Sequence, residues 1–205
     1  MDHKVEAVVK AYQARADEEV AIARGLVSEN RQRDLDDLLL PIGAAAAQFV
    51  NLLIKEAKAR AILEVGTSYG YSTVWLAEAA RESGGTVTTL ELHPRKIDHA
   101  REKMAEAGLA DYVDFRLGDA LETLAALPGP FDFVLLDLWK DLYVASFDAI
   151  YPKLADGALI VADNMLYPER ARANADAYRD RVRAAPDMTS VLLPIGSGLE
   201  VSRYR

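Results

Sequence analysis

Short apolar runs alternate with amphipathic stretches along most of the chain. Apolar residues recur at helical intervals through 1–28, and residues 43–58 are rich in strong helix formers. Strand-like apolar runs follow at 61–65, 86–92, 113–117, 131–137 and 158–163. Helix-like stretches separate them at about 71–82, 94–108, 119–126 and 141–154. This alternation predicts a parallel sheet with helices on both faces, and the nearly continuous apolar strands indicate that both faces are buried.

The pattern changes after residue 163. A charged helix is expected at about 168–184, followed by two short strands at 188–195 and 198–205. Gly196–Ser197–Gly198 joins these strands, so they are expected to close the sheet in antiparallel fashion. The fold class predicted is α/β, a doubly wound, mostly parallel seven-stranded sheet with extra N-terminal helices. We expect a single domain over 1–205, with a helical cap at 1–42 and a catalytic core at 43–205.

Composition excludes several classes of protein. The chain has no cysteine, which excludes disulfides and thiolate chemistry, and its net charge of −8 disfavours nucleic-acid binding. There is no apolar run of membrane-spanning length, and the N-terminal stretch is too charged for a signal peptide. We therefore expect a cytoplasmic protein with a small-molecule partner, no nucleic acid and no membrane, present as a monomer or homodimer.

A glycine-containing turn follows the first predicted strand. Glu64, Gly66 and Gly70 form the pattern E-x-G-x-x-x-G just before a helix, where backbone N–H groups can face a ligand. Ser68 stands where a dinucleotide fingerprint needs its middle glycine, and no Gly-Lys-Ser/Thr follows as a P-loop requires. At the end of the second strand, Glu91 is placed to accept hydrogen bonds from two ribose hydroxyls.

Oxygen-bearing side chains follow the fourth and fifth predicted strands. Asp137 ends one strand, and Asp163 and Asn164 end the next. In a parallel sheet these residues reach the same carboxyl edge as the glycine turn, where such sheets bind ligands. Two carboxylates and an amide suit Mg²⁺, with Ca²⁺ or Mn²⁺ possible. Each residue alone has a plainer interpretation, as a helix cap or a turn.

Four separated segments resemble known methyltransferases. The glycine turn resembles the first motif of class I methyltransferases, which bind S-adenosylmethionine. The segments D-L-W-K-D-L-Y (137–143) and A-D-N-M-L-Y-P (162–168) resemble the metal-dependent O-methyltransferases of the catechol and caffeoyl-CoA type, as does G-L-E (198–200). The resemblance runs from about Gly43 to Glu200, and the segments agree in order and spacing.

This resemblance implies a role for each matching residue. Asp137, Asp163 and Asn164 would hold the metal, Lys140 would be the general base, and Glu200 would orient the second acceptor hydroxyl. Trp139 would pack against cofactor and acceptor. The residues expected to bind the cofactor are Ile42, Gly43, Glu64, Gly66, Thr67, Ser68, Tyr69, Gly70, Ser72, Glu91, Leu92, Gly118, Asp119, Ala120, Asp137 and Trp139.

The expected acceptor is a catechol-type small molecule, since a dication can chelate two adjacent oxygens. The chain departs from the human-type catechol O-methyltransferase in three places. An aromatic residue is missing at Leu38–Leu40, and Leu138 stands where that enzyme has a His. The span between Asn164 and Glu200 is also longer. Alternatives are a caffeoyl-CoA-like or other hydroxylated aromatic acceptor, and a non-catalytic domain that binds S-adenosylmethionine. The acidic charge disfavours a nucleic-acid methyltransferase, and Ser68 disfavours a nicotinamide-dependent dehydrogenase.

Overall fold

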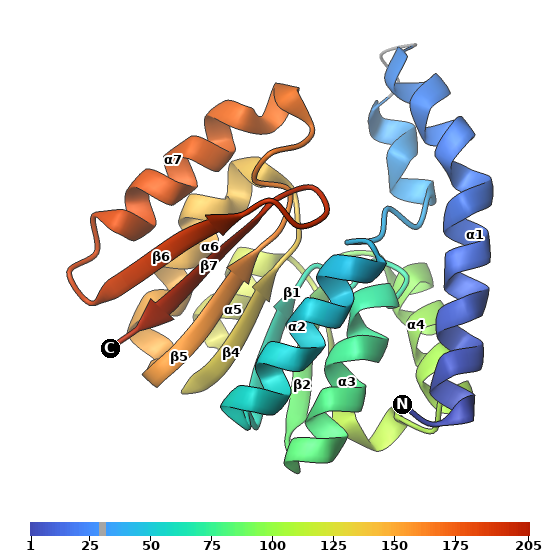
Figure 1. Ribbon diagram of the computed structural model, residues 1–205, viewed down its shortest axis with the longest axis horizontal. Coiled ribbons are helices and arrows are strands. Elements are labelled where there is room, and N and C mark those ends of the chain that lie inside the picture. The colour runs from blue at the N-terminus through green and yellow to red at the C-terminus, as the bar shows by residue number, and fades with distance from the viewer. Residues whose placement is uncertain (29–31) are drawn as a thin grey trace.

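The computed structural model describes residues 1–28 and 32–205, and in this part of the chain the strands form one seven-stranded sheet (Figure 1). The strand order is β3-β2-β1-β4-β5-β7-β6. The strands are β1 (Ala61–Val65), β2 (Thr86–Glu91), β3 (Val113–Leu117), β4 (Phe131–Leu136), β5 (Leu154–Ala162), β6 (Met188–Leu193) and β7 (Leu199–Tyr204). The pairs among β1 to β5 are parallel, whereas β7 runs antiparallel to both β5 and β6. The predicted doubly wound sheet with an antiparallel C-terminal end is confirmed.

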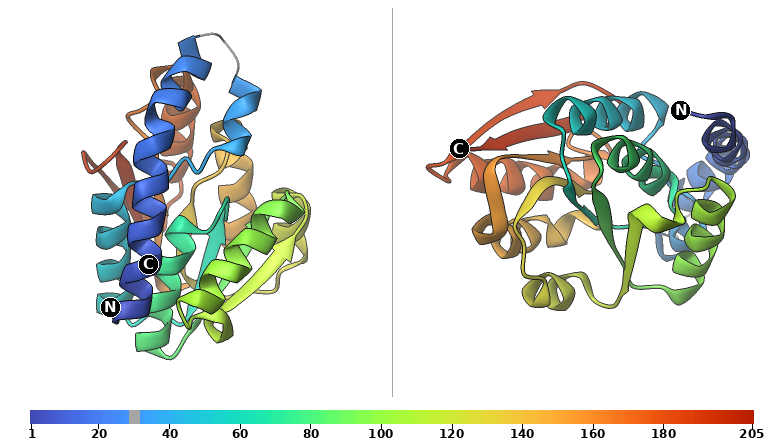
Figure 2. Two further views of the ribbon diagram at one scale, coloured as in Figure 1. Left: turned by 90° about the vertical axis from the view of Figure 1, so that its right-hand side faces the viewer. Right: turned by 90° about the horizontal axis from the view of Figure 1, so that it is seen from below.

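Helices cover both faces of this sheet (Figures 1 and 2). The layer of α2, α3 and α4 lies on one face and the layer of α5, α6 and α7 on the other, with α1 packed outside α3 and α4. The helices are α1 (His3–Ser28), α2 (Ala44–Ala57), α3 (Tyr71–Ser83), α4 (Pro94–Glu106), α5 (Ala120–Ala126), α6 (Tyr143–Ile150) and α7 (Arg172–Arg183). Short 3-10 helices are η1 (Gln32–Asp37), η2 (Ala110–Tyr112), η3 (Lys140–Leu142), η4 (Tyr151–Lys153) and η5 (Glu169–Ala171).

The register of the parallel strands sets the position of the site. Leu90 of β2 pairs with Val65 of β1, Val65 pairs with Leu136 of β4, and Leu136 pairs with Ala162 of β5. These four residues form one row across the sheet, so the residues that follow them emerge along a single carboxyl edge. Those residues are Glu91, Gly66, Asp137 and Asp163. Open α/β sheets bind ligands at this edge.

Several predicted boundaries differ from the structure, and the clearest cases lie around β5. Strand β5 begins at Leu154 rather than at residue 158, because its Asp156–Gly157 pair, which has the character of a turn, lies inside the strand. The helix expected at 141–154 is instead η3, α6 and η4 in succession. Pro152 accounts for the end of α6, because it has no N–H to continue the α-helical hydrogen bonds and lies instead in the first turn of η4.

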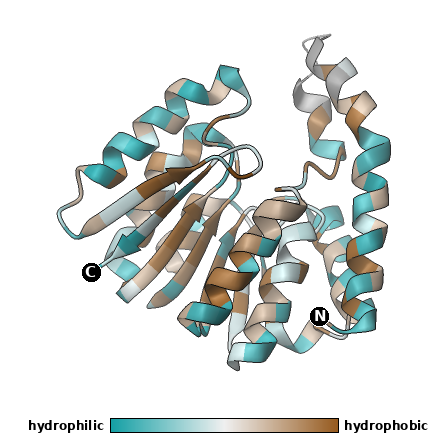
Figure 3. Ribbon diagram, viewed as in Figure 1, coloured by the Kyte–Doolittle hydropathy of each residue, from teal (hydrophilic) through white to brown (hydrophobic). Residues whose placement is uncertain are grey.

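The buried apolar side chains of the long helix α1 lie toward its N-terminal end. Val5, Val8, Tyr12 and Ala16 recur every three or four residues and are buried, whereas Val20 and Ile22 are exposed. The predicted cap at 1–42 includes residues 29–31, which lie outside the described residues. Figure 3 shows apolar residues concentrated in the central strands, and polar ones on the outer helices α1 and α7. Among the described residues, no helix combines the length and apolar character needed to cross a membrane.

Candidate active site

The turn after β1 lies directly against the end of β4. Gly66 has φ +106°, and a Cβ atom there would lie 2.1 Å from the backbone oxygen of Asp137. Only glycine tolerates both the left-handed backbone and this close approach. The N–H groups of Gly66 and Thr67 both donate to Leu90 O of β2, at 3.1 and 3.0 Å. The predicted glycine turn therefore lies between β2 and β4, beside the predicted metal ligand Asp137.

Glu64 lies beneath this turn and is fully buried. Its Oε2 accepts hydrogen bonds from Thr73 Oγ1 and Thr89 Oγ1, both at 2.6 Å, and its Oε1 has no partner among the described residues. Burial raises the pKa of Glu64 to about 7, and the negative charge of Asp137 adds to that rise, although hydrogen bonds from Ser72, Thr73 and Thr89 oppose it. A buried carboxyl with a free oxygen can receive a cationic or hydrogen-bonding group of a ligand.

Glu91 organises the backbone around the end of β2. Its Oε2 accepts from Ser68 N at 2.9 Å, and its Oε1 accepts from Leu92 N at 2.9 Å and His93 N at 3.0 Å. A carboxylate has about four acceptor positions, so these three bonds leave room for a ligand hydroxyl. The sequence predicted the ligand contact but not these backbone contacts.

The turn after β3 is a helix cap bordered by exposed apolar side chains. Asp119 Oδ1 accepts from Leu121 N and Glu122 N and so caps α5. Leu92 follows β2 and is 59% exposed, and Leu117 ends the neighbouring strand β3 and is 56% exposed. Exposed apolar side chains at a ligand-binding edge suit an aromatic ring such as adenine. The sequence singled out Leu92 but missed Leu117, because nothing in a strand pattern indicates which terminal residue is left uncovered.

The N-terminal elements hold the glycine turn from outside. Tyr12 of α1 donates to Tyr69 O at 2.5 Å, Tyr69 donates to Asp37 O at 3.2 Å, and Ser68 Oγ donates to Leu39 O at 3.4 Å. The guanidinium of Arg15 lies 4.1 Å from the centre of the Tyr69 ring. The sequence did not single out Tyr12 or Arg15, because both look like ordinary positions on an amphipathic helix.

The remaining predicted cofactor residues lie around the same turn. Ile42 is buried just before α2, and Gly43 has φ +90° with open space where a Cβ would be. Gly70 has φ +94° and precedes α3, and Ser72 in its first turn is nearly buried.

Two carboxylates emerge together from the ends of β4 and β5. Asp163 N donates to Leu136 O at 3.0 Å, which joins the residue after β5 to the last residue of β4. Burial raises the pKa of Asp137, and the pKa of Asp163 is raised well above its usual value by burial and by the charge of Asp137. Asn164 follows with φ +58°, so the chain turns sharply at this point.

The donor set fits a hard divalent cation. Asp163 is 1% exposed, and its Oδ1 has no hydrogen-bond partner among the described residues. A buried carboxylate that faces a second, partly buried one is destabilising unless a positive charge balances the pair. In the described part of the chain no three His, Cys, Asp or Glu side chains form a metal-binding group, so a third protein ligand would be the amide of Asn164. Oxygen-only ligands of this kind favour Mg²⁺ over Zn²⁺.

Lys140 of η3 contacts Asp137, one member of this carboxylate pair. Its Nζ lies 3.5 Å from Asp137 Oδ1 and donates to Leu138 O at 2.9 Å and to Tyr143 Oη at 2.8 Å. Tyr143 is fully buried, and burial together with Asp137 and Asp163 raises its pKa well above the usual value, so its phenol stays neutral. The sequence missed Tyr143, although its spacing of three residues from Lys140 was a signal that the two side chains could meet.

Aromatic side chains lie open to solvent beside the carboxylates. Trp139 follows Asp137 by two residues and is 49% exposed, and Tyr167 follows Asn164 by three and is 68% exposed. Large exposed aromatic residues near a polar site are typical of a surface that receives a ligand.

Glu200 of β7 pairs with Ala162, the residue before Asp163, but its side chain is buried. It is 0% exposed, and its two carboxylate oxygens accept hydrogen bonds from Arg179 Nε at 3.1 Å, Arg183 Nη2 at 3.0 Å and Ser190 Oγ at 2.7 Å. Both arginines belong to α7. The carboxylate therefore belongs to an ion-pair network that joins α7, β6 and β7, a structural role that the sequence did not predict. The role of Glu200 toward an acceptor hydroxyl stays a prediction.

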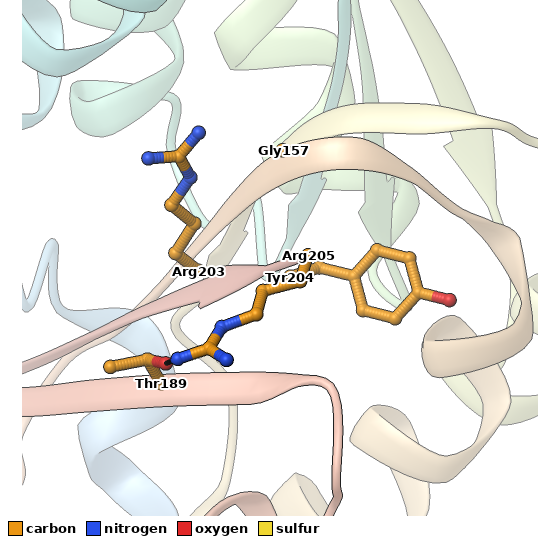
Figure 4. A pocket seen from close by; sticks show the side chains of 5 residues that line it. All are labelled: Gly157, Thr189, Arg203, Tyr204 and Arg205. Atoms are coloured by element: carbon orange, nitrogen blue, oxygen red, sulfur yellow. Dashed lines mark hydrogen bonds between the residues drawn. The ribbon is translucent and has the colours of Figure 1, made fainter.

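An open cavity of about 450 Å³ lies at the opposite end of the sheet (Figure 4). It is lined by Gly157, Thr189, Arg203, Tyr204 and Arg205. Arg203 and Tyr204 end β7, which runs antiparallel to β5, so this cavity is remote from the carboxyl edge. The cavity contains none of the predicted site residues.

Comparisons with known proteins relate the sequence to one family of enzymes. The family profile described as O-methyltransferase matches residues 13–203. A catechol O-methyltransferase of Mycobacterium tuberculosis is 40% identical over 128 residues, which cover 62% of this chain and 58% of that protein. Caffeoyl-CoA O-methyltransferase 1 of Eucalyptus globulus is 30% identical over 185 residues, covering 80% of this chain and 75% of the relative. The match to the M. tuberculosis protein thus spans less than two thirds of that protein's length.

A solved structure extends the likeness to three dimensions. An O-methyltransferase from Bacillus cereus, in complex with SAH, superposes with a TM-score of 0.75 at 27% identity. The match covers 98% of this chain and 100% of that one.

Proposed function

Because the chain belongs to the O-methyltransferase family, we propose that it transfers the methyl group of S-adenosylmethionine to one hydroxyl of a catechol-type small molecule. Asp137, Asp163 and Asn164 hold a divalent cation for this reaction, Mg²⁺ before Ca²⁺ or Mn²⁺. The observation that carries the proposal is the buried Oδ1 of Asp163, which has no partner among the described residues and lies near the partly buried carboxylate of Asp137. Lys140 supplies an amine beside them.

The cofactor site is formed by the turn after β1 and its neighbours. Gly66 lets the backbone approach Asp137, Glu64 offers a free buried oxygen, and Glu91 retains acceptor capacity for ribose hydroxyls. Leu92 and Leu117 provide an apolar contact for the adenine. The B. cereus relative was solved with SAH, the product form of this cofactor, which supports the assignment.

Lys140 acts as the general base that takes the proton of the attacking hydroxyl. When bound, the cation lowers the pKa of a coordinated hydroxyl, and S-adenosylmethionine supplies the electrophilic methyl group. Lys140 would accept the proton of the acceptor hydroxyl, whose oxygen would take the methyl group that S-adenosylmethionine gives up from its sulfur. Trp139, exposed beside Asp137, packs against the acceptor ring.

We expect Lys140→Ala to lower kcat roughly 100-fold or more while the Kd for S-adenosylmethionine changes little. The two constants are measured by a methyl-transfer assay and by calorimetry. Asp141→Asn is the matched control, because Asp141 is the exposed neighbour of Lys140 in η3. Wild-type turnover in Lys140→Ala would remove the base from the proposal.

A second acceptor class follows from the other named relatives. Caffeoyl-CoA O-methyltransferases align over 80% of the chain, and Trp139 and Tyr167 are exposed enough to border an acceptor larger than catechol. Another hydroxylated aromatic or a non-catalytic role in binding S-adenosylmethionine is less favoured, since Lys140 lies beside the carboxylate pair.

The decisive assay is methyl transfer to a panel of acceptors with added Mg²⁺ and with excess chelator. The panel contains catechol, the same ring with one hydroxyl already methylated, and caffeoyl-CoA. We expect Mg²⁺-dependent methylation of catechol and none of the blocked ring, because only two adjacent free oxygens can chelate. Equal rates on both rings, or full activity in chelator, would contradict the proposal. No transfer to any acceptor despite cofactor binding would favour the non-catalytic role.

A further inference from the structure

The amine of Lys140 is held by two acceptors that are not part of the carboxylate pair. Its Nζ donates to Leu138 O at 2.9 Å and to Tyr143 Oη at 2.8 Å, and it faces Asp137 Oδ1 at a longer 3.5 Å. An ammonium has three N–H bonds, so the two short contacts use two of them. A neutral amine has two N–H bonds and one lone pair. The same two contacts then hold both N–H bonds, so the lone pair points in the third direction, toward Asp137 Oδ1.

Tyr143 is itself held so that its oxygen can only accept from Lys140. Its ring is fully buried in α6, and its hydroxyl lies 2.9 Å from Leu136 O and 3.2 Å from Asp163 O. Because a phenol has one proton, that proton goes to one of these carbonyls and the oxygen lone pairs face the lysine. The two carbonyls belong to the last residue of β4 and to the residue after β5, so the rigid sheet edge fixes the phenol.

We propose that Tyr143 is a positioning residue for methyl transfer, whose oxygen holds Lys140 so that the lone pair of the amine is presented on the Asp137 side. This inference rests on the proposed function, in which Lys140 is the base. The acceptor O–H bond breaks and a new N–H bond forms on Lys140. Tyr143 keeps its own proton throughout and acts only through the direction it imposes on the amine.

Tyr178 of α7 offers a matched comparison. It is also fully buried, it packs edge-on against Tyr143 at 5.4 Å between ring centres, and its hydroxyl has no partner among the described residues. Replacing either tyrosine by phenylalanine removes one buried hydroxyl and keeps the ring. Only the change at Tyr143 removes a contact to Lys140.

The test compares Tyr143→Phe and Tyr178→Phe on two acceptors, catechol and 4-nitrocatechol. The nitro group makes the hydroxyl much more acidic, so this acceptor depends less on a base. We expect Tyr143→Phe to lower kcat for catechol roughly tenfold, with a much smaller loss for 4-nitrocatechol and an unchanged Kd for S-adenosylmethionine. Tyr178→Phe should retain the wild-type ratio of the two rates. That ratio does not depend on how much of a variant is folded.

Further outcomes distinguish the inference from the proposed function. In the Lys140→Ala background, Tyr143→Phe should have no additional effect on catechol, because it acts through the lysine. The positioning role would be overturned if Tyr143→Phe lowered kcat equally on both acceptors or gave the same ratio of rates as Tyr178→Phe. It would also be overturned if the effects of Lys140→Ala and Tyr143→Phe on catechol were additive in the double variant. Wild-type turnover of catechol by Lys140→Ala would instead overturn the base assignment itself.

Discussion

Replacement of Glu200 by glutamine separates a structural role from a catalytic one. The carboxylate is fully buried and accepts three hydrogen bonds, from Arg179, Arg183 and Ser190. Glutamine keeps the shape of the side chain but removes the negative charge. The two guanidinium groups would then lie beside a neutral amide in the interior, without the charge that balances them.

The expected loss of stability follows from how buried each partner is. Removing one member of a buried ion pair costs roughly 3–5 kcal/mol. The side chain of Arg179 is 18% exposed, whereas that of Arg183 is 46% exposed and can turn toward water. The lower end of that range, about 3 kcal/mol, therefore applies here, which for a domain of this size lowers Tm by roughly 6–12 °C.

Thermal unfolding and steady-state kinetics of the same variant test this reasoning. Asp176→Asn is the control, because Asp176 bonds the same Arg179 at 3.2 Å but is 49% exposed, so its loss should cost less than about 1 kcal/mol. The KM of Glu200→Gln for the acceptor should stay within about twofold of the wild-type value, since both carboxylate oxygens are already held by Arg179, Arg183 and Ser190. An unchanged Tm together with a large rise in that KM would refute the reasoning and restore the orienting role.

Three further changes test the cofactor side of the site. Gly66→Ala should abolish binding of S-adenosylmethionine in calorimetry, because its Cβ would lie 2.1 Å from Asp137 O; wild-type affinity would contradict the packing described. Tyr12→Phe leaves Tyr69 O without its donor and should weaken cofactor binding by up to about tenfold, whereas an unchanged Kd would show that α1 does not brace the turn. Burial raises the pKa of Glu64 to about 7, so its stabilising contribution is complete below about pH 4.3 and is lost as pH rises toward 7. The Tm of Glu64→Gln should therefore fall less than the wild-type Tm between pH 5 and 8. Parallel curves of Tm against pH for the two proteins would refute the pKa shift.

The sheet and the alignment of its carboxyl edge could be predicted because they depend on local pattern. Strands β1 and β4 are nearly continuous apolar runs, and their common direction follows from the helices between them. Once that direction is known, the residues after each strand must share one edge. The start of β5 could not be predicted, because Asp156–Gly157 has the composition of a turn and lies in a strand only through its tertiary pairing.

Side-chain partners were the least predictable part of the site. The alternation in β7 indicates that Glu200 lies on one face of the strand, but it does not reveal that Arg179 and Arg183 of α7 cover that face. Likewise the sequence pattern predicts only that Tyr12 is an apolar position of an amphipathic helix. The packing of α1 beside the glycine turn is what brings its hydroxyl to Tyr69 O. Such contacts join elements that are distant in sequence, and no local periodicity encodes them.

The central claim is that Asp137, Asp163 and Asn164 hold one divalent cation at the edge of the sheet. Titration of the protein with Mn²⁺, followed by electron paramagnetic resonance and by competition with Mg²⁺, measures that binding directly. The account predicts a single saturable site in the wild type and in the Asp141→Asn control, displaced by Mg²⁺ and lost in Asp163→Asn. Equal Mn²⁺ binding by the wild type and Asp163→Asn, or no saturable site in the wild type, would contradict it.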